Sequence, residues 1–296
     1  MMKPFAGVNV AAVTPHGKRG DEPDIAATLE LIDFLCAAGV QGITLLGSTG
    51  EFVNLDSGDR VRLAYLAVKR SRVPVLAGVS HSTLDGALAL GREATAAGAA
   101  GLLVMPPYFF RYGQIEVREF YLRFAEEMGH AAPLYLYNIP VFTNAIARET
   151  AAELLASGHF AGIKDSSGDW EYFEALLRQA QDHAFTLLVG HDSIFARARM
   201  AGADGIVSGI ACAVPELLLS LDRAIQEGAA AEIERLDARL QEFVHRIEGF
   251  PAPIGIKAAL AERGIKTGHL ATPLGRQTRA ALDEFREWFR GWLKSL

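Results

Sequence analysis

Lys164 is the residue of this chain whose position most directly suggests covalent chemistry. It ends the short apolar run 160–163, which predicts a buried strand, and it precedes the turn-rich segment 165–168 with its candidate helix caps. Burial of a lysine disfavours the charged form and frees the neutral amine, which is the nucleophile that makes a Schiff base with a carbonyl compound. Two other interpretations remain open: the side chain extends to solvent, or it pairs with Asp165.

Two neighbouring hydroxyl groups lie in a glycine-flanked turn. Residues 47–51 read Gly-Ser-Thr-Gly-Glu, and Ser48 and Thr49 could hold a carboxylate together with the backbone N–H groups of such a turn. The same residue types also favour a helix-capping loop. Tyr137 ends another apolar run, where it could exchange protons with Lys164 or contact only water at a rim.

Two further segments carry side chains of interest. Residues 106–112 read Pro-Pro-Tyr-Phe-Phe-Arg-Tyr, an aromatic cluster that either lines a pocket or simply packs. Residues 190–192 read Gly-His-Asp and follow an apolar run. Each of these signals is weak alone, but all of them come directly after expected strands.

The elements that must position these residues alternate between strand and helix. The apolar runs predict eight strands, at residues 8–14, 40–46, 74–79, 101–105, 133–137, 160–164, 185–189 and 205–208. Helical patterns predict helices at 24–38, 56–71, 82–97 with Ser82 as N-cap, 114–128, 147–156, 169–180, 193–201 and 215–226. Eight such units favour a closed parallel (β/α)8 barrel, a TIM barrel of the α/β class, over an open sheet. Active sites of this architecture lie at the C-terminal ends of the strands.

The chain divides in two at the point where strands cease. We expect a catalytic barrel over 1–229 and a C-terminal helical extension over 230–296, with helices at 230–247, 254–263 and 278–293, packed on the barrel. No GxGxxG motif follows the first strand, which argues against a dinucleotide-binding fold.

The composition indicates an ordinary enzyme. The net charge of -6, without a basic stripe, makes nucleic acid and anionic membranes unexpected partners. Two cysteines are too few for a disulfide framework, so we expect a reducing, cytoplasmic setting. Residues 1–5 contain no apolar leader, no apolar run is long enough to span a bilayer, and no cluster has metal-ligand spacing.

Three motifs in this order identify a resemblance. The segments are 47–51 (GxxGE), 137–140 (Tyr-Asn-Ile-Pro) and 162–165 (Gly-Ile-Lys-Asp). The chain resembles the dihydrodipicolinate synthase and N-acetylneuraminate lyase family of class I aldolases over nearly its whole length. The resemblance implies a small-molecule lyase, and a homotetramer built as a dimer of dimers.

The resemblance also implies roles for the matching residues. Lys164 would form the Schiff base with pyruvate or another 2-keto acid, and Tyr137 would act as general acid and base. Ser48 and Thr49 would bind the pyruvate carboxylate and pass protons towards the tyrosine. No metal or cofactor is implied beyond the covalent Schiff base. Two more matching positions would face the substrate: Gly190 and the backbone carbonyl of Val207.

The chain departs from the family pattern at two positions. The arginine that binds the carboxylate of aspartate semialdehyde in the dihydrodipicolinate synthases is replaced by Phe142, which cannot form charge-assisted bonds. The relay tyrosine, often lent by a neighbouring subunit, aligns with Phe109, and Tyr108 lies beside it. Proton relay would then run through the hydroxyls of the 47–51 turn and water, or through Tyr108.

The segment 190–195 points to a different substrate. It resembles the GxDxIF stretch of the sialic-acid and keto-deoxy-sugar lyases, so Asp192 would accept hydrogen bonds from substrate hydroxyls, or it would cap the following helix. We therefore expect an aldolase or dehydratase of a 2-keto-3-deoxy sugar acid or a related 2-keto acid. The alternatives are dihydrodipicolinate synthase itself, with a basic residue such as Arg111 in place of the missing arginine, and a non-catalytic sensor of 2-keto acids.

Overall fold

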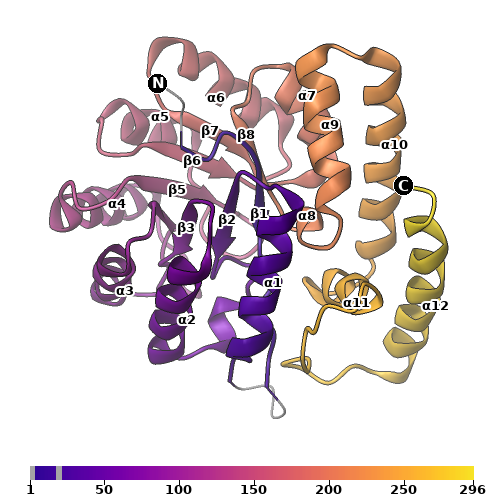
Figure 1. Ribbon diagram of the computed structural model, residues 1–296. Coiled ribbons are helices and arrows are strands. Elements are labelled where there is room, and N and C mark those ends of the chain that lie inside the picture. Colours follow the sequence, from indigo (N-terminus) through magenta and orange to yellow (C-terminus); the bar gives the residue numbers. More distant parts are fainter. Residues whose placement is uncertain (1–3, 18–21) are drawn as a thin grey trace.

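The computed structural model describes residues 4–17 and 22–296 as a closed barrel of parallel strands surrounded by helices (Figure 1). Residues 1–3, part of the segment in which we expect no apolar leader, lie outside the described residues. The strands pair in chain order, and β8 closes on β1. They are β1 (Gly7–Ala11), β2 (Gly42–Leu45), β3 (Val75–Gly78), β4 (Gly101–Val104), β5 (Leu134–Asn138), β6 (Gly162–Asp165), β7 (Thr186–Val189) and β8 (Gly205–Ser208). The predicted (β/α)8 barrel is confirmed.

Every residue of all eight strands is buried, which explains why the strands read as continuous apolar runs rather than alternating ones. The strands are shorter than several of the predicted runs, because the apolar pattern continues into buried loop residues such as Ala12, Val13 and Leu46. Sheet pairing also carries β6 one residue beyond Lys164, to Asp165.

The helices form the outer layer of the barrel (Figure 1). They are α1 (Ile25–Ala38), α2 (Ser57–Arg70), α3 (Leu84–Ala97), α4 (Gln114–Met128), α5 (Arg148–Ala156), α6 (Trp170–Asp182), α7 (Phe195–Met200), α8 (Ile210–Ala213) and α9 (Pro215–Glu227), with two 3-10 turns, η1 (Phe52–Asn54) and η2 (Asp192–Ile194). Within the described part of the chain, no helix has the length and apolar character needed to cross a bilayer.

Side chains cap four of these helices, α1, α2, α3 and α6, at their N-terminal ends. The side chain of Asp24 accepts from the Ala27 N–H at 3.0 Å, and Asp169 caps α6 in the same way. The prediction of Ser82 as the cap of α3 is wrong. Thr83 is the residue with extended backbone, and its Oγ1 accepts from the Gly86 N–H at 3.2 Å.

Three C-terminal helices lie on one side of the barrel (Figure 1): α10 (Ala230–Ile247), α11 (Ile254–Glu262) and α12 (Arg276–Leu293). Helix α10 contacts α9 and η2, while α11 contacts α8 and α12. The division into 1–229 and 230–296 stays a prediction. The contacts of α10 and α11 nevertheless bring C-terminal residues to the loops that follow β7 and β8.

Candidate active site

Three polar side chains from three parts of the barrel meet in a continuous chain. Tyr137 on β5 and Lys164 on β6 are register partners on neighbouring strands. Lys164 Nζ donates to Tyr137 Oη at 3.2 Å, and the same hydroxyl lies 2.9 Å from Ser48 Oγ. The chain thus joins a primary amine, a phenol and an alcohol, which are the groups needed for amine addition to a carbonyl and for proton transfer.

The open alternatives for Lys164 and Tyr137 are wrong. Lys164 is 3% exposed and Tyr137 1% exposed, so neither side chain reaches solvent at a rim. Nor does Lys164 neutralise Asp165, whose carboxylate accepts from Asn138 Nδ2 at 2.7 Å and from Ser167 Oγ at 2.8 Å. Burial raises the pKa of Asp165 to about 6, against the lowering effect of those hydrogen bonds.

The turn that carries Ser48 is held tightly. Leu46 lies in the left-handed region, with φ 57°, and its backbone packs where a Cβ at Gly78 would clash. The turn does not cap the following segment, because η1 has no side-chain cap. Thr49 lies near the end of β8, since its Oγ1 would be 3.4 Å from a Cβ placed at Gly209.

Gly190 lies directly against Lys164. A Cβ at this position would overlap Ser166 Oγ and come within 2.7 Å of Lys164 Cε, closer than side chains approach one another. The Gly190 N–H donates to the Asp165 carbonyl at 2.7 Å, and its own carbonyl accepts from Ser166 Oγ at 3.1 Å. The site therefore requires a residue without a side chain here.

Asp192 faces the barrel and does not cap the helix after it. Its carboxylate accepts a short hydrogen bond from Ser208 Oγ at the end of β8, and burial raises its pKa, with the hydroxyl of Ser208 and the charges of His191 and Lys164 acting in the opposite direction. The capping interpretation is therefore wrong. Val207, the residue before Ser208, is 1% exposed in the barrel wall opposite Asn9, and the role of its carbonyl stays a prediction.

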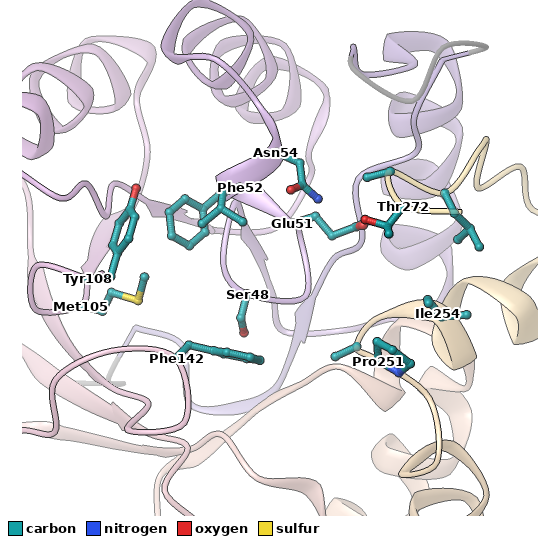
Figure 2. A pocket seen from close by; sticks show the side chains of 14 residues that line it. Ser48, Glu51, Phe52, Asn54, Met105, Tyr108, Phe142, Pro251, Ile254 and Thr272 are labelled. Atoms are coloured by element: carbon teal, nitrogen blue, oxygen red, sulfur yellow. The ribbon is translucent and has the colours of Figure 1, made fainter. Parts of the chain in front are cut away.

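A cavity of about 320 Å³ opens beside Ser48. Figure 2 shows Ser48 between Phe52 and Phe142, with Tyr108 and Met105 on one side and Pro251 and Ile254 on the other. Most of these side chains are apolar. Its charged lining residue, Glu51, is already paired with Lys257. A second carboxylate on a substrate would therefore find no free cation among the residues that line this cavity.

A second cavity, of about 240 Å³, lies on the other side of the segment that connects α10 and α11. Its polar lining comes from the β7 loop, with His191, Asp192 and Ser193, and from Glu248 at the end of α10. Pro251 and Ala252 line both cavities. The polar groups beside Lys164 thus face one cavity, and the apolar groups beside Ser48 face the other.

The predicted aromatic residues do not all reach the site. Phe142 and Tyr108 line the first cavity, and burial raises the pKa of Tyr108. Phe109 is 87% exposed, has φ 81°, and packs edge-on against Phe110 outside the cavity. The substrate-binding role of Phe109 thus stays a prediction that needs a neighbouring subunit. Arg111 donates to the Thr143 carbonyl at 3.2 Å and does not line either cavity.

The sequence analysis missed several residues of this region. Phe52 and Met105 have no signal beyond their apolar character, whereas Lys257, a lone cation in the apolar helix α11, could have been noticed. Among the described residues, no group of three or more His, Cys, Asp or Glu side chains is placed to hold a metal ion. The absence of a cofactor stays a prediction.

Comparisons with known proteins agree with this geometry. A family model described as the dihydrodipicolinate synthetase family matches residues 4–290. The chain is 35% identical over 274 residues to a 4-hydroxy-tetrahydrodipicolinate synthase of Xylella fastidiosa, covering 91% of this chain and 89% of the relative.

Solved structures are similar over the same extent. A prophage protein of E. coli K12, which belongs to the dihydrodipicolinic acid synthase family and was solved in complex with pyruvate, is 25% identical with a TM-score of 0.88, covering 97% of this chain and 98% of that one. A Ruminococcus gnavus sialic acid aldolase, solved as a catalytic lysine mutant, gives a TM-score of 0.89 over 100% of this chain and 99% of that one. At 21% identity, this last similarity shows the fold alone.

Proposed function

The chain belongs to the dihydrodipicolinate synthetase family and is an enzyme of the lyase class, and from that premise we propose that Lys164 forms a Schiff base with pyruvate or another 2-keto acid. The observation that carries the proposal is the chain of contacts from the buried Lys164 amine through Tyr137 to Ser48. The pyruvate complex of the related E. coli protein supports a 2-keto acid as the ligand.

Each group then has a defined step. The lone pair of Lys164 Nζ attacks the keto carbon, and loss of one water from the adduct leaves a protonated imine. The imine withdraws electrons, so that a C3–C4 bond can break, or a C3 proton can leave, with formation of an enamine. Tyr137 Oη transfers the protons, and Ser48 passes them on. Ser48 and Thr49 hold the substrate carboxylate, and no metal or other cofactor takes part.

For the substrate, we propose a 2-keto-3-deoxy sugar acid or a related 2-keto acid. Asp192 supports this choice, because its carboxylate faces the barrel beside Lys164, where it can accept hydrogen bonds from substrate hydroxyls. His191 and Ser193 add polar groups to the same cavity.

Dihydrodipicolinate synthase activity is the second candidate, because relatives such as the Xylella fastidiosa protein carry that name. Two observations disfavour it. Phe142 occupies the place of the carboxylate-binding arginine and lines an apolar cavity, and Arg111 is not there to replace it. Burial of a carboxylate without a partner is strongly unfavourable.

The first experiment is borohydride reduction in the presence of pyruvate, followed by mass spectrometry. We expect a covalent adduct on Lys164, and none in a Lys164→Ala variant. A wild-type protein without an adduct would overturn the proposal. Trapping without turnover of any 2-keto acid would favour the non-catalytic sensor.

The second experiment identifies the substrate. A panel of 2-keto-3-deoxy acids is screened for pyruvate release, beside an assay of pyruvate with aspartate semialdehyde. Asp192→Asn should weaken turnover of the hydroxylated acids and leave trapping by pyruvate nearly unchanged. Ordinary enzyme rates with aspartate semialdehyde would overturn the sugar-acid assignment in favour of the second candidate.

We also propose a cellular location and a subunit assembly for the enzyme. The presence of only two cysteines, both free, supports a cytoplasmic location. The exposed rings of Phe109 and Phe110 support a subunit contact near the site, in a homotetramer built as a dimer of dimers. Analytical ultracentrifugation of the wild type and of Phe109→Asp tests this assembly, since a charged side chain at the contact should shift the protein towards smaller species.

A further inference from the structure

A buried ion pair outside the chemistry described above joins the C-terminal helix α11 to the turn that carries Ser48. The ammonium of Lys257, which is 2% exposed, contacts Glu51 Oε2, and Nε2 of the fully buried His16 lies 3.4 Å from the same oxygen. Burial alone would raise the pKa of Glu51, but the contact with His16 and the charge of Lys257 hold that pKa below its ordinary value. Glu51 is therefore a carboxylate held between two partners.

The backbone of Glu51 is in a conformation that needs such support. Its φ of 51° and ψ of 34° lie in the left-handed region, which residues with a side chain occupy only when their surroundings hold them there. The Glu51 N–H donates to the Ser48 carbonyl at 3.0 Å and so closes the turn. On the opposite side, Thr14 Oγ1 donates to the Gly50 carbonyl at 2.7 Å. The position of Ser48 thus depends on these two hydrogen bonds, one from the Glu51 N–H and one to the Gly50 carbonyl.

A buried charged pair is a poor way to join two elements if stability is the only result. Apolar packing of similar volume usually stabilises as well or better, because the two charges lose their hydration. Apart from Lys257 and the terminal Glu262, helix α11 is apolar, and its C-terminal end is tied to the barrel by Arg263, which donates to the Ala213 carbonyl at 2.8 Å. The ion pair is therefore not needed to attach the helix.

From these contacts we infer that Lys257 is a positioning residue: through Glu51 it fixes the turn 47–51, so that the C-terminal helices complete the active site. The inference rests on the proposed function, in which Ser48 and Thr49 bind the substrate carboxylate. Lys257 does not line the first cavity, whereas Glu51 does, so Lys257 acts on the substrate only through Glu51. Loss of the Lys257 side chain should weaken binding of the 2-keto acid more than it slows the chemical steps that follow.

The test compares Lys257→Met, Glu51→Gln and the double variant with the wild type. The readout is the pyruvate concentration that gives half-maximal borohydride trapping on Lys164, together with the extent of trapping at saturation. We expect the half-maximal concentration to rise about 10- to 100-fold in all three variants, since a displacement of about 1 Å in a binding group has effects of this size. Trapping at saturating pyruvate should remain close to complete.

The double variant separates positioning from stability. Lys257→Met leaves the Glu51 carboxylate without Lys257, and Glu51→Gln leaves the Lys257 ammonium without a carboxylate. The double variant contains neither of these two buried charges. We therefore expect its thermal midpoint to recover towards the wild type, while its half-maximal pyruvate concentration stays high. If Lys257→Met does not fold, the double variant alone decides.

Arg263→Gln is the matched control, because it removes a cation that ties the same helix to the barrel away from the turn. It should trap at pyruvate concentrations close to those of the wild type. The inference is overturned if the double variant also traps at wild-type concentrations, or if Arg263→Gln shifts the concentration as much as Lys257→Met. Absence of trapping in the wild type would instead overturn the proposed function, and the inference with it.

Discussion

Tyr137 and Lys164 are direct register partners on β5 and β6, and Lys164 Nζ donates to Tyr137 Oη at 3.2 Å. Register partners on neighbouring parallel strands point to the same face of the sheet, so this contact follows from strand pairing and not from a loop conformation. Groups placed on strands are held more precisely than groups on loops. Of the three linked groups, only Ser48 depends on a loop for its place.

Tyr137→Phe removes the hydroxyl between the amine and Ser48. We expect turnover of the active 2-keto acid to fall by about 10²- to 10⁴-fold, the usual contribution of a positioned acid–base group. The adduct on Lys164 should still form, because the amine remains. Steady-state rates and mass spectrometry after borohydride reduction measure the two effects separately. Tyr135→Phe, two residues earlier on the same strand, should leave turnover nearly unchanged, and a similar loss in both variants would contradict the assignment.

Phe142→Arg places a cation in the apolar cavity beside Ser48. We expect kcat/KM for aspartate semialdehyde to rise at least about 10-fold, because a charge-assisted pair with a carboxylate contributes more than about 1.4 kcal/mol when it is shielded from water. Val141→Arg is the control, since it adds the same charge to the preceding residue, which is 75% exposed and does not line the cavity. Equal rates in the two variants would mean that Phe142 does not select the substrate.

The barrel and its catalytic face could be predicted because their signals are local. Every strand is buried on both faces, so each one is visible as an apolar run, and the residue types that follow the runs mark one end of the barrel. Lys164 and Tyr137 belong to these strands. Once the eight strands are in chain order, their neighbouring positions follow from the topology.

Other features depend on contacts between distant residues and have no local signal. Ser82 and Thr83 are both suitable caps, and only the backbone conformation, which is extended at Thr83, decides between them. The sequence alone also allows Asp192 to act as a cap, because its partner Ser208 is on another strand. The pairing of Lys257 with Glu51 joins the C-terminal helices to the second βα loop, and no periodicity indicates such a contact.

Asp165→Asn should change how stability depends on pH. The pKa of Asp165 is about 6 in the folded protein, above the value of about 3.9 of an unfolded chain, so the folded state binds more protons between these values. Its contribution to stability is therefore greatest below about pH 4 and is lost as the pH rises through 6. The loss amounts to about 2–3 kcal/mol, from 1.36 kcal/mol per pKa unit.

Urea denaturation between pH 4 and 7.5 measures this dependence. Asparagine keeps an oxygen that can accept from Asn138 or Ser167 and has no charge to desolvate. The free energy of unfolding of Asp165→Asn, relative to the wild type, should thus increase with pH and level off above pH 7. A difference between the two proteins that does not change with pH would show that Asp165 titrates at an ordinary value.

Gly190→Ala tests how closely the lysine is confined. The added Cβ would overlap Ser166 Oγ and lie 2.7 Å from Lys164 Cε, so both side chains must shift, and the amine would leave its place 3.2 Å from Tyr137 Oη. Gly190 is not among the residues with positive φ, so alanine introduces no backbone strain, and the effect comes from the methyl group alone. We expect the rate of trapping by pyruvate to fall about 10²-fold, as for a displacement of about 1 Å, with a loss of about 1–3 kcal/mol in stability from overpacking.

Gly275→Ala is the matched control, because Gly275 has an ordinary φ of -64° and no atom lies within 4 Å of the added Cβ. It should trap pyruvate at the wild-type rate, with only the small loss of stability expected when alanine replaces glycine at the N-cap of α12. If Gly190→Ala also traps at that rate, the barrel mouth accommodates the methyl group without moving the amine. The hydrogen bond to Tyr137 would then be enough to hold the Lys164 amine in place, and contact with residue 190 would not set its position.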